Sequence, residues 1–460
     1  MRKFVSSILV CVFLMTLVAA CAPQATPEPT EVPAPTEVPA DGPTDEPEPT
    51  EAAEPTAEPE PTAEPEPVTL TFWHAYGGAR GELMEQLVAE FNESHPYITV
   101  EPEYGGNLWT MRDKLLTAIA GDVGPDISQI DQFWSSELAD AGALIKVGDL
   151  IDADPEVSTA DFYDQIWETA IADGEIWSMP FSFSNIALYY NKALFAEAGL
   201  DPEQPPANWD ELAEMGQQLT VDKDGDGTPD QWGLNFTLQA NFGNIYYWLA
   251  FLWQNDGELF SEDFTSSKFQ EEPGVEALQF WVDLVHKYEA VPLAPPEQGF
   301  ENGLIAMYFA STANLTEFRG ILGEDFGLAP MPAGKQQATG VGGGNLAIFS
   351  TTPDVDASWE FVKWMTSEEV NLRWSLASGY LPLRPGVVES DEYQAYLVEE
   401  PYAQVVLDQM PYGVVRPNIA AYAPASREIG LAVEEAVFGN LDPKASLEAA
   451  AVKVDALLQQ

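Results

Sequence analysis

A proline-rich, acidic segment near the N-terminus, residues 22–67, sets the limit on what this chain can fold into. Its 46 residues include 14 Pro, 13 acidic residues and no Lys or Arg, in repeats such as PTEVPAPTEVP and EPTAEPEPTAEPEP. Proline fixes φ and removes a hydrogen-bond donor, and like charges repel, so we expect an extended polyproline-type spacer. A packed core must therefore come from residues 68–460.

The residues before this spacer have the pattern of a secretion signal. Arg2 and Lys3 precede a largely apolar run over residues 4–20, which ends in Leu-Val-Ala-Ala before Cys21. This ending resembles a lipobox, which implies that residues 1–21 are a lipoprotein signal peptide and that Cys21 is the lipidated first residue of the mature chain. The alternative is an ordinary signal peptide that is cut nearby. We expect attachment to the membrane by the lipid anchor only.

Net charge excludes one class of partner. The whole chain has a formal net charge of −56, and residues 68–460 carry 17 basic and 62 acidic residues, a net charge of −45. A phosphate backbone is bound by Lys and Arg, so no nucleic acid is expected as a partner. Two Cys, of which Cys11 leaves with the signal, exclude a disulfide framework and a zinc site of four cysteines.

Strand and helix patterns alternate in the first part of the folded region. Period-two or β-branched runs predict strands, and apolar residues at helical spacing predict helices. The expected order is strand 68–73, helix 81–94, strand 98–102, helix 111–120 and strand 126–130. Later elements are a strand over 186–190, a helix over 209–219, a glycine-rich stretch at 340–344 that leads into a strand, and helices over 357–365, 368–376, 426–438 and 443–458. The predicted fold class is α/β, with a parallel sheet at its start.

An ordered set of short motifs carries a family resemblance. The motifs are Thr-Phe-Trp-His at 71–74, Phe-Asn-Glu-Ser-His-Pro at 91–96, Gly-Pro-Asp-Ile at 124–127, Leu-Tyr-Tyr-Asn-Lys at 188–192, Ala-Gly-Leu-Asp-Pro at 198–202 and Ser-Gly-Tyr-Leu-Pro at 378–382. In this order the chain resembles the extracellular solute-binding proteins of ABC importers, in the group of maltose and glycerol-3-phosphate binders. The resemblance implies a periplasmic-binding-protein-like fold, with two α/β lobes around a ligand cleft that closes by a hinge.

The resemblance also implies where the lobes divide. Lobe 1 comprises residues 68–182 plus 338–392, and lobe 2 comprises residues 183–337 plus 393–460. The crossings are expected near 182–185, 335–338 and 390–393. Ligands of open α/β sheets bind beyond the carboxyl ends of the strands, which agrees with this placement.

Candidate ligand contacts follow from motif positions in the resemblance. Ser184, Ser311, Gly344 and Tyr380 match ligand-binding positions, and Arg427 matches an arginine that pairs with phosphate. Other positions depart from the family pattern: a Tyr falls on Leu108 beside Trp109, a Glu falls on Gln132 beside Asp131, and a Trp pair falls near Asn241, Phe242 and Asn244. We therefore expect a ligand site from the residues Trp109, Asp131, Gln132, Ser184, Asn244, Ser311, Gly344, Tyr380 and Arg427.

Each candidate also has a structural alternative. Tyr380 and Ser184 could satisfy local turns, Trp109 could belong to the core, Asp131 could cap a helix, and Arg427 could pair with one of many carboxylates.

A calcium-loop pattern stands apart from the resemblance. Residues 222–230 read Asp-Lys-Asp-Gly-Asp-Gly-Thr-Pro-Asp, with Asp at positions one, three, five and nine and Gly at six. This is the start of an EF-hand-type loop, and it nominates Asp222, Asp224, Asp226, Thr228 and Asp230 as ligands of a structural Ca²⁺. The twelfth position is Gly233 rather than the usual Glu, so an empty acidic turn is the alternative.

Three classes of function are compatible with a secreted chain of this size. A solute-binding lipoprotein that delivers a sugar to an ABC permease is favoured over a secreted polysaccharide hydrolase and over an adhesin. No Gly-x-Ser-x-Gly or His-Glu-x-x-His motif is present, and the α/β order disfavours a β-sandwich adhesin. We therefore expect a protein that is not an enzyme, is a monomer, and works at the cell surface or in the periplasm. The strongly negative charge favours a neutral sugar or oligosaccharide as ligand, with glycerol-3-phosphate or a related polyol phosphate as the alternative.

Overall fold

One long strand, β6 (Met179–Asn191), connects the two halves of the main sheet. The computed structural model describes residues 66–240 and 242–459, apart from the side chains of Trp109 and Phe242. All thirteen residues of β6 are buried. Its first part pairs antiparallel with β10 (Thr339–Ile348), and from Ile186 onward it pairs with β8 (Ile305–Ser311). A strand covered on both faces in this way favours a continuous apolar and small-residue sequence.

The sheet has nine strands in the order β2-β1-β3-β10-β6-β8-β7, with β11 paired to β10 and β9 paired to β6. Its other strands are β1 (Val68–His74), β2 (Ile98–Tyr104), β3 (Ile127–Asp131), β7 (Trp232–Asn235), β9 (Phe326–Ala329) and β11 (Gly413–Val415). Strands β4 (Ile171–Ala172) and β5 (Glu175–Ile176) form a separate two-stranded sheet. Strands β1, β2 and β3 are parallel, as the sequence predicts, whereas β10 runs antiparallel to both of its long neighbours.

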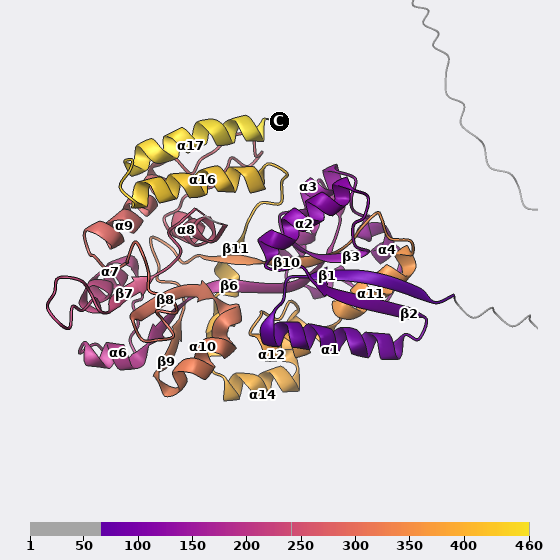
Figure 1. The fold of residues 1–460 in the computed structure, drawn as a ribbon, viewed down its shortest axis with the longest axis horizontal. Coiled ribbons are helices and arrows are strands. Elements are labelled where there is room, and N and C mark those ends of the chain that lie inside the picture. Colours follow the sequence, from indigo (N-terminus) through magenta and orange to yellow (C-terminus); the bar gives the residue numbers. More distant parts are fainter. Residues whose placement is uncertain (1–65, 241, 460) are drawn as a thin grey trace, which may run out of the picture. The chain divides into compact units, whose positions relative to one another are not determined.

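Helices cover both faces of this sheet (Figure 1). The longer ones are α1 (Gly78–Ser94), α2 (Leu108–Ala120), α7 (Trp209–Gln218), α8 (Phe242–Gln254), α9 (Glu272–His286), α10 (Leu315–Leu322), α11 (Val355–Met365), α12 (Glu368–Ser378), α14 (Asp391–Glu399), α16 (Tyr422–Val437) and α17 (Pro443–Leu458). The short ones are α3 (Ser135–Asp140), α4 (Val147–Ala153), α5 (Asp164–Trp167), α6 (Lys192–Glu197), α13 (Pro385–Glu389) and α15 (Tyr402–Asp408). None of the helices described over 66–240 and 242–459 is both long and apolar enough to cross a membrane.

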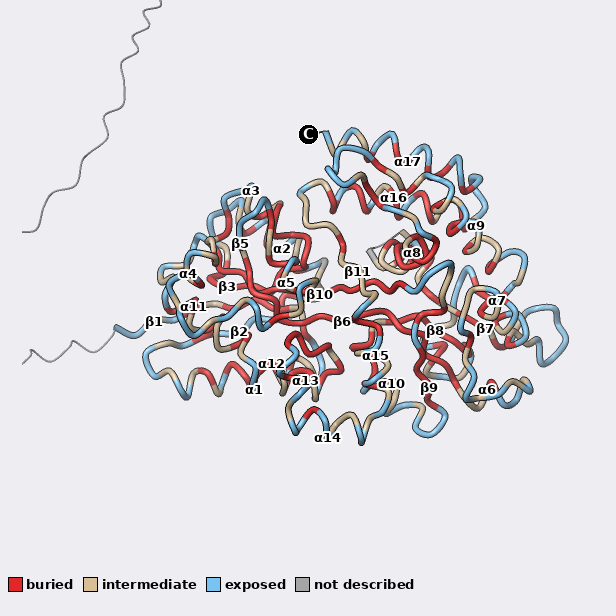
Figure 2. Tube along the Cα trace, turned by 180° about the vertical axis from the view of Figure 1, so that it is seen from behind, coloured by how far each residue is buried: buried red, intermediate tan, exposed pale blue. Residues whose placement is uncertain are grey.

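Two apolar clusters form the core, and alternate residues of β6 belong to each. Leu188 packs in the cluster that contains Trp248 and Trp281, whereas Tyr189 packs in the cluster that contains Phe72 and Trp374. This alternation follows from the period of two along a strand. Figure 2 shows the buried strands as a continuous layer between the more exposed helices.

Several helix ends follow the capping residues of the sequence. Asn208 and Ser367 accept hydrogen bonds from backbone N–H groups in the first turns of α7 and α12. Gly379 ends α12 in the left-handed conformation, with φ +76°. This turn places Tyr380 directly after the helix.

Two predicted boundaries are wrong. Residues 340–344 lie inside β10 rather than in a stretch before the strand, because residues 341–344 pair with β6 and Gly340 pairs with β11. Helix α16 begins at Tyr422, four residues before the prediction, because Pro424 is tolerated in a first turn, where its N–H is not needed. The division into two lobes stays a prediction.

Candidate functional site

A row of glycines on β10 brings polar side chains against the backbone of the central strands. Gly340, Gly342 and Gly344 lie on one face of the sheet, because alternate residues of a strand share a face. Gly342 pairs with Ser184, and Gly344 pairs with Ser182. A Cβ atom at Gly342 would lie 3.0 Å from the Tyr246 ring and 3.1 Å from Arg416 Nη2. Glycine therefore leaves the space that these side chains occupy.

Asp131 and Arg416 form a buried ion pair beside this glycine row. Arg416 Nη2 lies 3.1 Å from Asp131 Oδ1, and the two residues are 7 % and 3 % exposed. Burial raises the pKa of the Asp131 carboxyl, and the Arg416 charge opposes that rise. Within the described part, Arg416 Nε is buried without a hydrogen-bond partner. A buried donor without a partner marks a place where a ligand acceptor would gain free energy.

Aromatic rings surround the Arg416 guanidinium. Its centre lies 4.5 Å from the ring centroid of Phe133 and 5.1 Å from that of Tyr246. The Tyr246 hydroxyl donates to the Gly340 carbonyl at 3.0 Å. Tyr422, at the start of α16, packs its ring 4.8 Å from Phe133. Helices α8 and α16 thus contribute the aromatic rings of Tyr246 and Tyr422 to this region near the end of β3.

A second polar group lies on the β6 side of the same face. Ser311 Oγ donates to Ser184 Oγ at 2.7 Å. The Tyr76 hydroxyl shares a hydrogen bond with Ser182 Oγ, and it accepts another from Gln129 Nε2 at 2.9 Å. Tyr380 lies edge-on to Tyr76, with ring centroids 6.2 Å apart. The Ser182 hydroxyl of β6 is therefore held beside Tyr76, and the hydroxyls of Ser184 and Ser311 link β6 to β8.

The structure brings five predicted site residues into these two groups: Asp131, Ser184, Ser311, Gly344 and Tyr380. Gln132 directly follows Asp131, and its backbone N–H donates to the Gly343 carbonyl at 3.1 Å. The Gln132 side-chain amide is buried, and neither of its polar atoms has a partner in the described part. The carboxyl end of β3 thus carries further unused hydrogen-bonding capacity.

Two predicted residues, Asn244 and Arg427, are not brought into this arrangement, and the position of a third is not tested. Asn244 is buried in α8 and donates to the carbonyls of Gly430 and Leu238, so it holds α8 to α16. Arg427 is exposed on α16, and the arginine beside Asp131 is Arg416. The side chain of Trp109 lies outside the described residues, as does that of Phe242.

The sequence prediction missed Arg416 and Tyr246. Arg416 stands between Val415 and Pro417 after a three-residue strand, and apolar flanks around an Arg are the only local signal for its burial. Tyr246 lies in α8, an apolar helix in which an aromatic residue at helical spacing is more often part of the core. Only the pairing of β11 with β10 and the packing of α8 against β10 show that both side chains reach Gly342.

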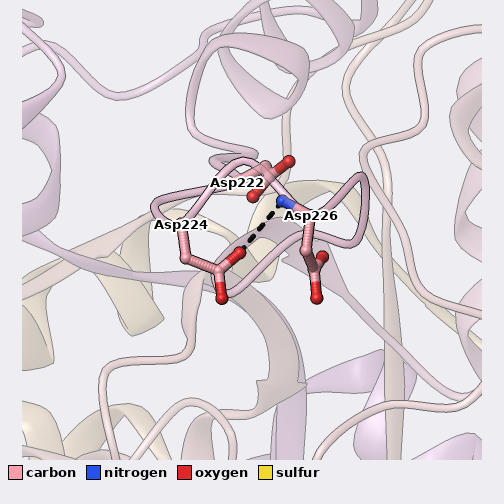
Figure 3. A group of neighbouring side chains, drawn as sticks. All are labelled: Asp222, Asp224 and Asp226. Carbon is pink, nitrogen blue, oxygen red and sulfur yellow. Dashed lines mark hydrogen bonds between the residues drawn. The ribbon is translucent and has the colours of Figure 1, made fainter.

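The acidic loop at 222–230 is a separate feature (Figure 3). One carboxylate oxygen from each of Asp222, Asp224 and Asp226 lies within 4.8 Å of the others, and all three residues are exposed. Asp222 accepts hydrogen bonds from the N–H groups of Gly225 and Gly227, which lower the pKa of its carboxyl. Asp230 Oδ2 accepts from Lys223 N at 2.7 Å. Three of the four predicted aspartates thus bring an oxygen into one group, and Asp230 is not part of it.

The last predicted positions of this loop differ in their surroundings. Thr228 N donates to Asp226 Oδ1 at 2.7 Å, as in a turn. Gly233, at the twelfth position, lies in β7, and its N–H donates to Thr220 Oγ1. The loop therefore offers short carboxylates but no bidentate Glu at its end.

Comparison with known proteins gives a consistent picture. Residues 86–399 match the family described as bacterial extracellular solute-binding protein. The chain is 25% identical over 409 residues to the sn-glycerol-3-phosphate-binding periplasmic protein UgpB of Yersinia pseudotuberculosis, which covers 85% of this chain and 92% of that protein.

Two solved structures share the fold. The cyclic α-maltosyl-1,6-maltose binding protein of Arthrobacter globiformis has a TM-score of 0.74 and 29% identity, covering 85% of this chain and 99% of that one. An ABC transporter solute-binding protein of Thermotoga lettingae, bound with α-D-tagatose, has a TM-score of 0.76 and 25% identity, covering 85% and 99%. The described residues thus have the mixed α/β architecture of periplasmic binding proteins.

Proposed function

Because the chain belongs to the bacterial extracellular solute-binding proteins, we propose that it captures a sugar or oligosaccharide outside the cytoplasm and delivers it to an ABC import permease. The relatives with similar folds are named as binders of tagatose and of a cyclic maltosyl-maltose, which supports this class of ligand. The proposed role is binding without catalysis. The ligand would lie against the glycine row of β10, in contact with both polar groups.

The buried pair of Asp131 and Arg416 carries this proposal. A carboxylate accepts hydrogen bonds and a guanidinium donates them, so the pair can hold neighbouring hydroxyls of a sugar, which both donate and accept. Its charges cancel locally, and the carboxylate would repel a phosphate placed on the same guanidinium. The partly buried Tyr246 ring offers a flat apolar surface nearby, as sugar sites commonly do.

A binding screen tests the proposal. The purified full chain would be titrated by calorimetry with tagatose, maltose, a cyclic maltosyl-maltose and glycerol 3-phosphate. We expect at least one sugar to bind with a Kd of about 10 μM or tighter, which stabilises the folded state by mass action. Binding of glycerol 3-phosphate alone, lost in Arg416→Ala, would overturn the sugar assignment in favour of a polyol phosphate.

Two further proposals concern attachment and assembly. We propose that Cys21 is lipidated and that residues 22–67 tether a monomeric binding domain to the outer face of the cell membrane. The pattern of residues 4–21 and the high proline content of the spacer support this. Globomycin, which blocks lipoprotein signal cleavage, should cause accumulation of the uncut chain, and Cys21→Ala should release the protein from the membrane fraction.

We also propose that the loop at 222–230 binds a structural Ca²⁺ through Asp222, Asp224, Asp226, Asp230 and the backbone at Thr228. Three converging carboxylates and the Gly at position six fit a hard cation that prefers oxygen ligands. The ion would relieve the repulsion between these carboxylates and tie down an exposed loop, which is closed at its base by the bridge between Val221 and Gln231.

A further inference from the structure

Arg80 is an unusual cation in this protein. Of the 17 Lys and Arg residues in the described part, 14 form an ion pair, and the other three are Arg80, Lys223 and Arg427. Lys223 stands between two aspartates of the acidic loop, and Arg427 is exposed next to Glu428. Arg80 is partly buried, in a first turn of α1 that has no acidic residue. With 62 acidic residues in the folded region, the lack of a carboxylate partner here needs a reason.

Arg80 lies at the β6 side of the candidate site. Its guanidinium centre is 5.8 Å from the ring centroid of Tyr380. Burial raises the pKa of the Tyr76 and Tyr380 hydroxyls, and the Arg80 charge opposes the rise in both. Burial also raises the pKa of Tyr189, whose hydroxyl donates to the Ser311 carbonyl, and the Arg80 charge opposes that rise too. Arg80 is thus close to the tyrosines that flank the serines of β6 and β8.

The two arginines, Arg416 and Arg80, differ in whether an ion pair neutralises their charge. Arg416 is 7 % exposed and is neutralised by Asp131, whereas Arg80 adds one positive charge that no ion pair neutralises. Arg416 reaches Gly342 on β10. Arg80 lies near the ring of Tyr380, which is edge-on to Tyr76, and the Tyr76 hydroxyl is bonded to Ser182 on β6. Neighbouring strands are about 5 Å apart and alternate residues of one strand about 7 Å apart, so a ligand that lies over Gly342 also lies near Ser182, whose hydroxyl is bonded to Tyr76.

We propose that Arg80 recognises an acidic substituent of the sugar, a carboxylate or a phosphate, while Asp131 and Arg416 hold its hydroxyls. The proposal rests on the proposed function and changes its ligand from the neutral sugar expected from the sequence to an acidic one. A planar guanidinium donates two parallel hydrogen bonds to either anion, which a neutral hydroxyl cannot match. The remaining protein is strongly negative, so an acidic ligand needs a local cation to bind at all.

Matched pairs of ligands test Arg80 directly. Glucose is compared with glucuronate and with glucose 6-phosphate, and galactose with galacturonate and with galactose 6-phosphate, by calorimetry on the full chain. We expect wild type to prefer an acidic member at least about tenfold over its neutral partner. The uronate and phosphate arms distinguish the two sources of negative charge.

Three variants separate recognition from packing. Arg80→Gln should reduce the preference for the acidic ligand to within about twofold and change the affinity for the neutral ligand little. Arg80→Lys should keep part of the preference, because lysine is a cation but cannot donate two parallel hydrogen bonds to the anion. Lys444→Gln removes the same unit of charge from exposed α17 and should leave the preference unchanged. The preference is expressed as the ratio of the affinities for the acidic and the neutral ligand in one protein. A salt titration would not serve, because added salt would screen both Arg80 and the negative surface.

The outcomes are distinct. Equal binding of neutral and acidic members, or a preference that survives Arg80→Gln, would overturn the role of Arg80 and leave the proposed function standing. An equal loss for both members in Arg80→Gln would show that Arg80 only packs against Tyr380. If no member of any pair binds, and no sugar of the wider screen binds, the proposed function itself falls and this inference falls with it.

Discussion

Arg416 Nη2 lies 3.1 Å from Asp131 Oδ1, although the two residues are 285 positions apart in the chain. Asp131 ends β3, and Arg416 follows β11, which pairs with β10. The pairings of β3 and of β11 with β10 thus bring together two charged side chains, both of which are buried. Such a pair loses hydration on burial, and the loss is recovered only if its geometry and hydrogen bonds are good. Within the described residues, Arg416 Nε is buried without a hydrogen-bond partner, so this donor is free to bond to a ligand under the proposed function.

The first prediction compares this arginine with the one that the sequence nominated. Arg416→Ala should weaken binding of the preferred sugar by about 1–3 kcal/mol, roughly 5- to 150-fold, because it removes hydrogen bonds from a charged donor. Arg427→Ala should leave the affinity within about twofold, because Arg427 is exposed on α16. Calorimetry on both purified variants gives the two values. A larger loss in Arg427→Ala would contradict the assignment of Arg416.

A paired substitution controls for damage to the fold. Arg416→Ala leaves the Asp131 carboxylate buried without its cation, which could cost about 3–5 kcal/mol of unfolding free energy. The double variant Asp131→Asn with Arg416→Gln removes both charges and should recover most of that stability. If it also recovers full sugar affinity, the pair is structural only.

The second prediction concerns the close approach at β10. Gly342→Ala should reduce sugar affinity at least about tenfold, because its Cβ would meet the Tyr246 ring at 3.0 Å and Arg416 Nη2 at 3.1 Å and displace them. Overpacking of this kind costs about 1–3 kcal/mol of stability. Gly320→Ala in α10, where a Cβ would meet nothing within 4 Å, is the control and should keep affinity and stability. Unchanged affinity in Gly342→Ala would place the ligand elsewhere.

Local sequence patterns predicted the elements well where the pattern itself determines the structure. The order of β1, α1, β2, α2 and β3 follows from hydrophobic periodicity, and α17 begins and ends where its proline and apolar spacing indicate. Gly344, Ser184 and Ser311 could be nominated because they stand beside recognisable motifs. These predictions depend on short segments of chain.

The rest of the site depends on pairings between distant segments. Arg416 and Tyr246 reach the glycine row only because β11 and α8 pack beside β10, which no local pattern shows. Arg427 was nominated because the family resemblance matches it to an arginine that pairs with phosphate, but its side chain is exposed on α16. Asn244 has the right chemistry for a sugar and uses it on the Gly430 carbonyl instead. Residue type alone cannot distinguish a ligand contact from a contact between helices.

The third prediction is a pH effect from a buried histidine under the site. Burial lowers the pKa of His74 to about 4, from a usual value near 6.5, and its Nδ1 accepts from the N–H of Tyr76 at 3.3 Å. The folded state therefore prefers neutral His74. Its contribution to stability is fully present above pH 6.5 and is lost as the pH falls from 6.5 through about 4.

The size of this effect can be measured against a variant that does not titrate. Between pH 7 and pH 4, the unfolding free energy of wild type should fall by about 3 kcal/mol more than that of His74→Asn, whose amide oxygen can still accept from Tyr76. Urea unfolding at several pH values provides the comparison. Parallel pH profiles for the two proteins would show that His74 is not held neutral by the fold.

The last prediction concerns metal removal. If Ca²⁺ binds the loop at 222–230, chelation should lower the melting temperature of wild type, because a ligand that binds only the folded state stabilises it by mass action. Asp224→Asn should remove this response, since it weakens one of the three carboxylates whose oxygens lie within 4.8 Å of one another. Glu392→Gln, an exposed carboxylate on α14, should respond to chelation as wild type does. Differential scanning calorimetry with Ca²⁺ and with EGTA measures the shift. Identical curves for wild type in both conditions, after residual metal has been removed, would mean that the hydrogen bonds of the turn alone hold these aspartates together.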